Sequence, residues 1–194
     1  MEYSALRIAL LPAAPHVPKG IETDGPVPGR HSILSLGAAA FAEAGVEAGC
    51  FSADLEARPG LAPNPGTMEW RATQPEARAR LPQGAAATGG GHGKICGLGL
   101  CPAGRPVFVA HPAAFDFQFV LDCLDEYVGK NPFGCAVINV RTYSMALLRR
   151  QCLASGKSAM PRAGIDPSPH THIALDDAVE QGRLSCTWLR ASRS

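Results

Sequence analysis

The chain has 194 residues, of which 46% are hydrophobic, and its mean hydropathy is close to zero. This length and composition allow one domain with a buried core and little more. Charged residues make up only 18% of the chain and give a formal net charge of +1, which excludes a polybasic chain and a highly charged disordered chain.

Glycine and proline, with 21 and 17 residues, together form about a fifth of the chain, which is above average usage. Residues 84–104 hold eight of the glycines and have neither a helical nor a strand period. We therefore expect a single domain over residues 1–194, in which residues 1–16 and 84–104 are poorly ordered.

The seven cysteines are odd in number and mostly far apart, unlike the dense cysteines of a disulfide-stapled secreted domain. This pattern favours a reducing, cytoplasmic location. The chain contains no apolar run of about 18 residues or more, so we expect no membrane-spanning segment and no membrane partner.

The first half of the chain predicts three strands and a broken helix. Residues 32–41 and 46–55 are apolar-rich runs around a turn at 43–45, which is typical of an antiparallel hairpin. The first strand of the sheet is expected near residues 17–23, although Pro18 and Gly20 lower its strand propensity. Residues 67–81 are helical at their ends, and Pro75 must end one helix or begin another.

In the second half, short apolar runs alternate with helical patterns. The predicted strands are 107–110 and 136–140, and the predicted helices are 115–128, 142–153 and about 172–181, the last one ended by Gly182. A hairpin followed by alternating strands and helices indicates an α/β domain with a mixed sheet.

The helix predicted over 115–128 carries a carboxylate within its apolar face. On a helical wheel, Val120, Cys123 and Tyr127 lie within about 40° of Asp116. A carboxylate at such a position costs several kcal/mol unless it is paired, bound to the helix N-terminus or bound to a metal. Asp116 is therefore either a helix-capping aspartate or a functional residue.

The last predicted helix repeats this pattern. Asp177 shares a face with Ala174, Ala178 and Gln181, and the two alanines would let the helix approach the sheet closely. His172 lies at the start of the helix, where its imidazole can reach the same centre. The alternative for His172 is a capping or surface histidine.

A third carboxylate, Glu22, stands in the first predicted strand and projects from the same face as Gly20 and Asp24 if the segment is extended. Glu22, Asp116 and Asp177 would then be three carboxylates from three separate elements. Three hard oxygen ligands suit Mg²⁺ or Mn²⁺ rather than zinc.

These residues stand in runs that resemble the DEDDh-type 3′-to-5′ exonucleases of the RNase T and DnaQ-like superfamily, in particular the compact bacterial exoribonuclease-like branch. The runs are IETDGPVPG (21–29), SILSLG (32–37), VFVAHPAAFD (107–116) and HIALDDA (172–178). The match covers about residues 20–76 and 105–183. It implies a ribonuclease H-like fold, with a mixed five-stranded sheet and flanking helices.

The resemblance also implies the chemistry of the site. The expected activity is hydrolytic release of nucleoside monophosphates from the 3′ end of single-stranded RNA or DNA, with RNA favoured, by two Mg²⁺ or Mn²⁺ ions. By resemblance, the metal ligands are Glu22, Asp116 and Asp177, the general base is His172, and the substrate-binding residues are Thr23, His111, Phe115 and Arg141. Because homodimers are common in the superfamily, a homodimer is one expected assembly.

A basic stretch between Tyr127 and Ile165 contains no acidic residue. Its basic residues are Lys130, Arg141, Arg149, Arg150, Lys157 and Arg162. In an exonuclease this stretch would receive the phosphate backbone of the substrate. The alternative is a solvated face that lacks carboxylates.

The chain departs from the family pattern at its first motif, which is Asp-x-Glu in the family and Gly20-Ile21-Glu22 here. Asp24 does not replace the missing aspartate, because it lies about 13 Å along an extended strand from Gly20. We therefore expect turnover that is reduced by orders of magnitude. The alternative function is a catalytically inactive nucleic-acid-binding protein of the same fold.

Two further hypotheses concern segments outside the motifs. Residues 1–19 and 77–104 lack the family's pattern, which translation from a shifted reading frame would explain. His92, Cys96 and Cys101 could supply three ligands of a zinc module, although no fourth ligand is evident.

Overall fold

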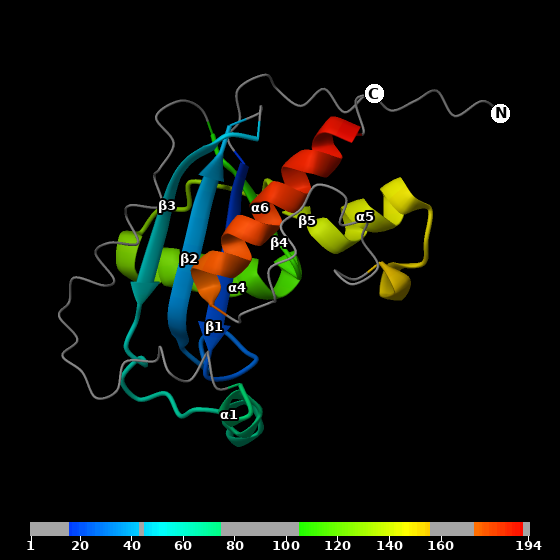
Figure 1. Cartoon of the computed structure of the whole chain (residues 1–194). Helices are drawn as coiled ribbons and strands as arrows, with labels where there is room; N and C mark the ends of the chain where they lie inside the picture. Colours follow the sequence, from blue (N-terminus) through cyan, green and yellow to red (C-terminus); the bar gives the residue numbers. More distant parts are fainter. Residues whose placement is uncertain (1–15, 43–44, 75–104, 156–172, 192–194) are drawn as a thin grey trace.

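The computed structural model describes residues 16–42, 45–74, 105–155 and 173–191, which form a five-stranded sheet with helices on both faces (Figure 1). The strands are β1 (His16–Thr23), β2 (Ile33–Phe41), β3 (Glu47–Asp54), β4 (Val107–Ala110) and β5 (Val137–Asn139). The helices are α1 (Pro65–Ala72), α4 (Ala113–Val128), α5 (Val140–Leu148) and α6 (Ala174–Ala191), and η2 (Cys152–Ala154) is a single 3-10 turn.

The sheet is mixed, as the sequence predicts. Its strand order is β3-β2-β1-β4-β5. The predicted hairpin is confirmed, because β2 pairs antiparallel with both β1 and β3. Strand β4 runs parallel to β1, and β5 runs parallel to β4. The carboxyl ends of β1 and β4 therefore lie at the same end of the sheet. Glu22, near the end of β1, and Asp116, just after β4, are found there.

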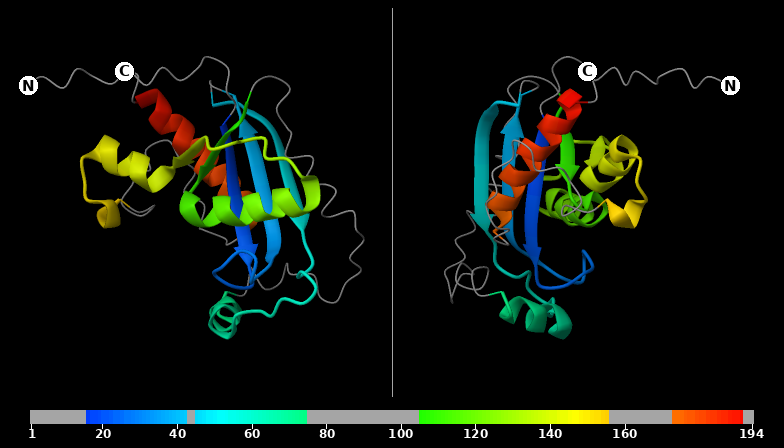
Figure 2. Two further views of the ribbon diagram at one scale, coloured as in Figure 1. Left: turned by 180° about the vertical axis from the view of Figure 1, so that it is seen from behind. Right: turned by 45° about the vertical axis from the view of Figure 1, so that its right-hand side comes forward.

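Helices α4 and α6 cover opposite faces of the sheet (Figure 2). The face under α4 holds the larger apolar cluster, which includes Val17, Phe108, Phe119, Leu124 and Phe133. On the other face, α6 packs against β1 and β2. This face holds smaller apolar clusters, one of which contains Val109, Leu184 and Trp188. The sheet thus separates the two helices that carry the acidic motifs.

Helix α6 approaches the sheet through two glycines that lie directly opposite each other, Gly20 in β1 and Gly37 in β2. A β-carbon at either position would overlap backbone atoms of Ala174, the first residue of α6. Ala174 and Ala178 are almost fully buried against this part of the sheet. The sequence prediction that small residues bring this helix close to the sheet is confirmed, and Gly20 and Gly37 (the glycine pair) supply the other half of the contact.

The predicted helix over 142–153 is wrong at both ends. The helix begins at Val140, because the Asn139 side chain accepts a hydrogen bond from the Arg141 N–H (3.2 Å) and ends the strand at that residue. It ends at Leu148, where Arg149 adopts a left-handed conformation with φ of 52°. Residues 152–154 form the separate turn η2.

The predicted end of the last helix at Gly182 is also wrong, since α6 continues to Ala191. Gly182 lies inside the helix, and a β-carbon there would overlap the ring of Phe41. This glycine therefore makes room for a core aromatic side chain and does not terminate the helix. The predicted helix over 115–128 begins two residues earlier, at Ala113, and ends at Val128 as predicted.

Arg58, in the loop between β3 and α1, attaches that loop to α4. Its guanidinium pairs with Asp122 and with Glu126 (3.0 Å), and it lies 5.9 Å from the ring centroid of Tyr127. At the other end of the same loop, Asn64 caps α1 by accepting a hydrogen bond from the Thr67 N–H (2.9 Å). These two contacts fix the position of α1 beside the end of β1.

Several expectations fall outside the described ranges. They are the poor order of residues 1–15 and 84–104, the continuation of the first helix after Pro75, and the zinc module at His92, Cys96 and Cys101. The reading-frame hypothesis for residues 1–19 and 77–104 also falls there, apart from residues 16–19, which form the start of β1. His16, expected to be poorly ordered, is the first residue of β1. Among the described helices, none is long and apolar enough to cross a membrane.

Replacing Gly37 by alanine is expected to lower the free energy of unfolding by about 1–3 kcal/mol, because the new β-carbon would overlap backbone atoms of Ala174 and Leu175. Urea denaturation followed by circular dichroism measures this change. Gly49→Ala in β3 is the matched control, since a β-carbon there meets no atom within 4 Å, and it should change stability by less than about 0.5 kcal/mol. Equal stability of the two variants would contradict the close approach of α6.

Candidate active site

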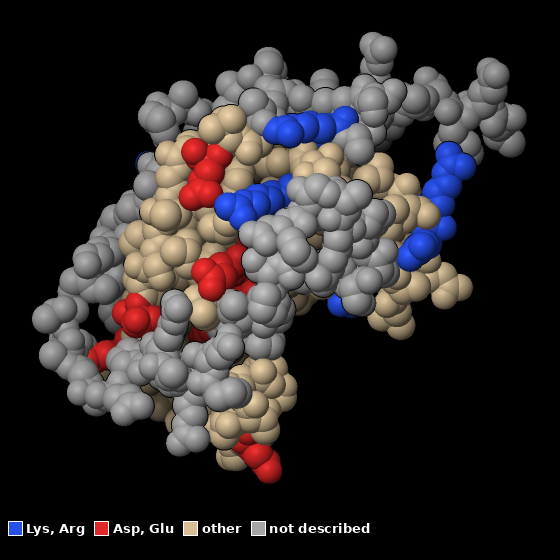
Figure 3. All heavy atoms as spheres, in the orientation of Figure 1, with Lys and Arg blue, Asp and Glu red and all other residues tan. Residues whose placement is uncertain are grey.

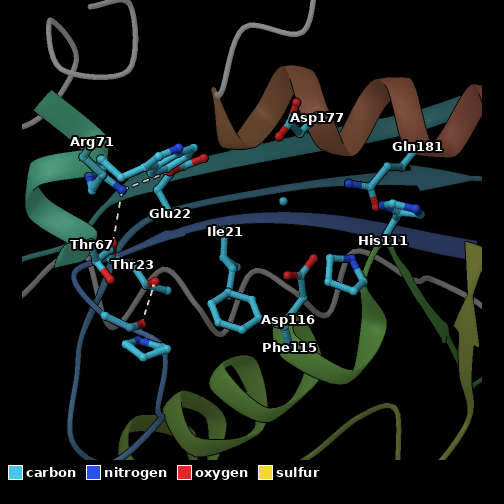
Figure 4. Close-up of a pocket in the computed structure, with 15 residues that line it drawn as sticks. Ile21, Glu22, Thr23, Thr67, Arg71, His111, Phe115, Asp116, Asp177 and Gln181 are labelled. Carbon is cyan, nitrogen blue, oxygen red and sulfur yellow. Dashed lines mark hydrogen bonds and ion pairs between the residues drawn. The ribbon is translucent and has the colours of Figure 1, made fainter. Parts of the chain in front are cut away.

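A pocket of about 340 Å³ lies beside the end of β1, between α1, α4 and α6 (Figure 4). Six of the eight residues that the sequence assigns to the site line this pocket: Glu22, Thr23, His111, Phe115, Asp116 and Asp177. They come from β1, from the turn after β4, and from the first turns of α4 and α6. The structure therefore brings together motifs that are about 150 residues apart in the chain.

Asp116 and Asp177 enter the pocket from opposite faces of the sheet. Asp116 lies in the first turn of α4 and is 6% exposed. Asp177 lies in the first turn of α6, where its N–H donates a hydrogen bond to the Ile173 carbonyl (3.0 Å). In Figure 4 the two carboxylates stand on either side of the end of β1. Each carboxylate thus sits in the first turn of its helix, near the positive end of the helix dipole.

Glu22 is held by a cation of the chain itself. Its carboxylate accepts a hydrogen bond from Nη1 of Arg71 at 2.9 Å, and the same nitrogen donates to the Thr23 carbonyl at 3.2 Å. The two paired side chains are only 5% and 13% exposed. In Figure 4 Glu22 turns toward α1. Sequence reasoning missed Arg71, because nothing in its local pattern distinguishes it from a solvated arginine.

Position 20 contributes no oxygen to the pocket. A β-carbon on Gly20 would overlap the Ala174 carbonyl oxygen, and it would lie 3.1 Å from the β-carbon of Asp177. Asp24 is elsewhere: it is 2% exposed, and its carboxylate accepts a hydrogen bond from the Ser32 N–H (2.6 Å). Asp24 therefore holds the loop between β1 and β2 and leaves the missing ligand unreplaced, as the sequence predicts.

Aromatic surface borders the same pocket. Trp70 of α1 lines it and is 49% exposed. Phe115 of α4 also lines it, supported from behind by Phe119 at a ring-centroid distance of 5.0 Å. Sequence reasoning missed Trp70, because its role depends on where the loop before α1 places that helix.

Two of the assigned residues are not seen in the pocket. Arg141 lies in α5, beyond the edge strand β5, and does not line the pocket. His172 lies outside the described ranges. The roles proposed for both residues from the resemblance stay predictions.

The described part of the basic stretch runs from the end of α4 past α5. Arg149 and Arg150 are exposed, whereas Lys157 and Arg162 are outside the described ranges. On the face shown in Figure 3, acidic side chains gather over the β3 and α1 side, and basic side chains lie toward α5 and the end of α6. The charge asymmetry seen in the sequence is therefore also spatial on this face.

Asp116 and Asp177 are candidate ligands for a divalent cation in this pocket. Mg²⁺ is commonly bound by one or two carboxylates together with substrate phosphates, and both side chains supply hard oxygen ligands to one pocket. Within the described ranges, no group of three or more His, Cys, Asp or Glu side chains is placed to hold a metal ion. The resemblance implies a two-ion centre, for which Gly20 supplies no side-chain ligand.

Comparisons with known proteins bear on the fold described above. No family model matches the chain. The "3′-5′ DNA exonuclease Cap18" of Escherichia coli is 24% identical over 181 residues, which are 84% of this chain and 86% of that protein. The nuclease domain of 3′hExo, a DEDDh family member bound to rAMP, has a TM-score of 0.68 at 13% identity and covers 92% of this chain and 93% of its own.

A second solved structure, the Mg²⁺- and Mn²⁺-bound form of S. pombe Pop2p, has a TM-score of 0.59 at 13% identity and covers 93% of this chain and 84% of its own. The resemblance that the sequence motifs predict is therefore confirmed. The chain has the ribonuclease H-like fold of these exonuclease structures, and it is similar in sequence to a 3′-5′ DNA exonuclease.

Proposed function

We propose that the chain binds the 3′ end of single-stranded RNA or DNA in this pocket and acts there as a slow, metal-dependent 3′-to-5′ exonuclease. The observation that carries the proposal is the convergence of Glu22, Asp116 and Asp177, three carboxylates from three separate elements, on one pocket. The fold shared with the exonuclease homologues supports the same activity.

The aromatic rim explains how a 3′ end would enter. Trp70 of α1 and Phe115 of α4 both line the pocket with aromatic rings, and bases of any sequence stack on such surfaces. A terminal base placed there would leave its sugar and phosphate beside Asp116 and Asp177. This arrangement favours a frayed or single-stranded end, because a base that is paired and stacked in a duplex does not present its face to these rings.

A small number of groups would carry out the hydrolysis. A divalent ion, Mg²⁺ or Mn²⁺, held by Asp116 and Asp177 would neutralise charge on the phosphate that is attacked. His172 is proposed as the general base for the attacking water, on the resemblance alone. Nucleoside monophosphates would be released from the 3′ end.

Slow turnover follows from two features of β1. Gly20 supplies no carboxylate, and Glu22 is engaged by Arg71. Taking one partner away from a buried ion pair is costly, because the other charge stays buried without a partner. Arg71 and a metal ion would therefore compete for the Glu22 carboxylate.

The second candidate function is a catalytically inactive protein that binds 3′ ends. It is favoured by the approach of Ala174 to Gly20, which fills the space of the missing side chain with helix backbone. In this case the pocket would still recognise an end, and hydrolysis would be absent.

The compartment and the assembly are proposed on weaker support. The five described cysteines are free thiols, and burial raises the pKa of Cys123 to about 11, so this thiol stays protonated at neutral pH. Free thiols are compatible with the cytoplasmic location expected from the sequence. A homodimer is proposed from the resemblance only.

A 3′-labelled oligoribonucleotide is expected to lose single nucleotides slowly with Mn²⁺ or Mg²⁺ and to stay intact with EDTA. Asp116→Asn and Asp177→Asn should each lower the single-turnover rate at least about 100-fold, because each removes a charged oxygen ligand. Asp125→Asn, on the exposed side of α4, is the matched control and should leave the rate unchanged.

The outcomes of this assay separate the candidates. Hydrolysis that persists unchanged in both pocket variants would contradict the proposed site. Binding of the labelled end without any hydrolysis would select the inactive binding protein. Absence of both binding and hydrolysis would contradict both functions.

Gly20→Asp is expected to lower the melting temperature and to raise the single-turnover rate by no more than a few-fold. Its β-carbon would overlap the Ala174 carbonyl, so the new carboxylate can enter only if α6 moves away from the sheet. Thermal denaturation and the same nuclease assay measure the two effects. A rate increase of about 100-fold at unchanged melting temperature would show that Gly20 is a missing ligand and nothing more.

A further inference from the structure

Gln181 stands at the end of the pocket opposite to α1. It is 3% exposed and lines the pocket from α6, one helical turn after Asp177. In Figure 4 its side chain descends from α6 toward the end of the pocket where His111 lies, and the carboxylates of Asp116 and Asp177 lie between this end and Arg71. Neither the exonuclease motifs nor the proposed reaction uses Gln181.

The amide of Gln181 has an unused acceptor. Its Oε1 is buried and receives no hydrogen bond from any of the described residues. Buried side-chain oxygens are nearly always hydrogen-bonded in folded proteins, since a buried acceptor without a donor loses its hydration and gains nothing in return. A ligand that brings a donor to this end of the pocket would satisfy it.

The position of Gln181 restricts which donor that is. With the terminal base against Trp70 and Phe115, the strand passes the carboxylates and leaves the pocket near Gln181. Phosphate oxygens along the strand are acceptors only, and a DNA backbone carries no donor within the chain. Base amino groups differ from one nucleotide to the next. The ribose 2′-hydroxyl is the donor that every RNA nucleotide offers at the same place.

We propose that Gln181 accepts a hydrogen bond from the ribose 2′-hydroxyl of a nucleotide just upstream of the scissile bond, and that it thereby makes the pocket prefer RNA over DNA. This inference rests on the proposed binding of 3′ ends. It adds a specificity-determining residue to that site and leaves the reaction itself unchanged. The amide nitrogen of the same side chain remains able to donate to a phosphate oxygen.

Fluorescence anisotropy with Mn²⁺ tests the proposal on 5′-labelled octamers of one sequence whose last linkage is a phosphorothioate that resists hydrolysis. The octamers are all-RNA, all-DNA, and RNA with one 2′-deoxynucleotide at each of the last three positions in turn. The unaltered protein should bind RNA about 3- to 10-fold more tightly than DNA, the affinity difference of one neutral hydrogen bond. One of the single 2′-deoxy substitutions should remove that difference.

Gln181→Met should weaken RNA binding by the same factor and leave DNA binding unchanged. Gln118→Met is the matched control, because Gln118 is exposed on α4 and its amide donates to the Ala114 carbonyl (2.6 Å) outside the pocket. It should leave both affinities unchanged. The 2′-deoxy series uses the unaltered protein, so the proposal stays testable even if Gln181→Met does not fold.

Equal affinity of the unaltered protein for RNA and DNA would overturn the role of Gln181 and leave the proposed function standing. An equal loss of RNA and DNA affinity in Gln181→Met, with no effect of any 2′-deoxy substitution, would do the same. Failure of every octamer to bind would contradict the proposed function and this inference together.

Discussion

The contact between the first turn of α6 and the glycine pair, Gly20 and Gly37, determines the geometry of the site. Two side chains are missing at directly opposed positions of neighbouring strands, so helix backbone packs against sheet backbone. The close approach of α6 to the sheet sets where Asp177 and Gln181 enter the pocket. It also excludes an oxygen ligand from position 20. One packing constraint therefore both builds the pocket and removes a ligand from it.

The Arg71–Glu22 ion pair also constrains the pocket, at the end that lies next to α1. It joins the last turn of α1 to the end of β1, and both side chains are largely shielded from water. The guanidinium of Arg71 thus gives Glu22 a cationic partner within the fold. The same contact places Trp70 at the rim of the pocket. The pocket thus has three carboxylates, one of which is paired with Arg71, and glycine at position 20; the proposed low turnover rests on this arrangement.

Much of the fold and part of the site could be predicted from the sequence. Asp116 was identified because a carboxylate in an apolar helix face is physically costly, and it is indeed buried there. Asp177 was identified because alanines on its helix face predict close packing against the sheet. Both inferences use one helix at a time, and helical periodicity is local information.

Features that depend on contacts between distant segments could not be predicted. Gly182 suggests a helix end by composition, yet it accommodates the ring of Phe41 from β2. Arg71, Trp70 and Gln181 look like ordinary helix residues until the loop from β3 and the sheet place their helices around one pocket. Their roles are set by tertiary position, which no local pattern records.

The number of metal ions that the pocket holds tests most directly whether the glycine pair and Arg71 leave the metal site incomplete. Mn²⁺ can be titrated into the protein with a phosphorothioate oligoribonucleotide that resists hydrolysis, and free Mn²⁺ can be followed by electron paramagnetic resonance. We expect one ion per chain, bound only when the oligonucleotide is present, because Asp116 and Asp177 need a phosphate to complete the site. Two ions per chain, or tight binding without oligonucleotide, would contradict the central claim that the glycine pair and Arg71 leave the metal site incomplete.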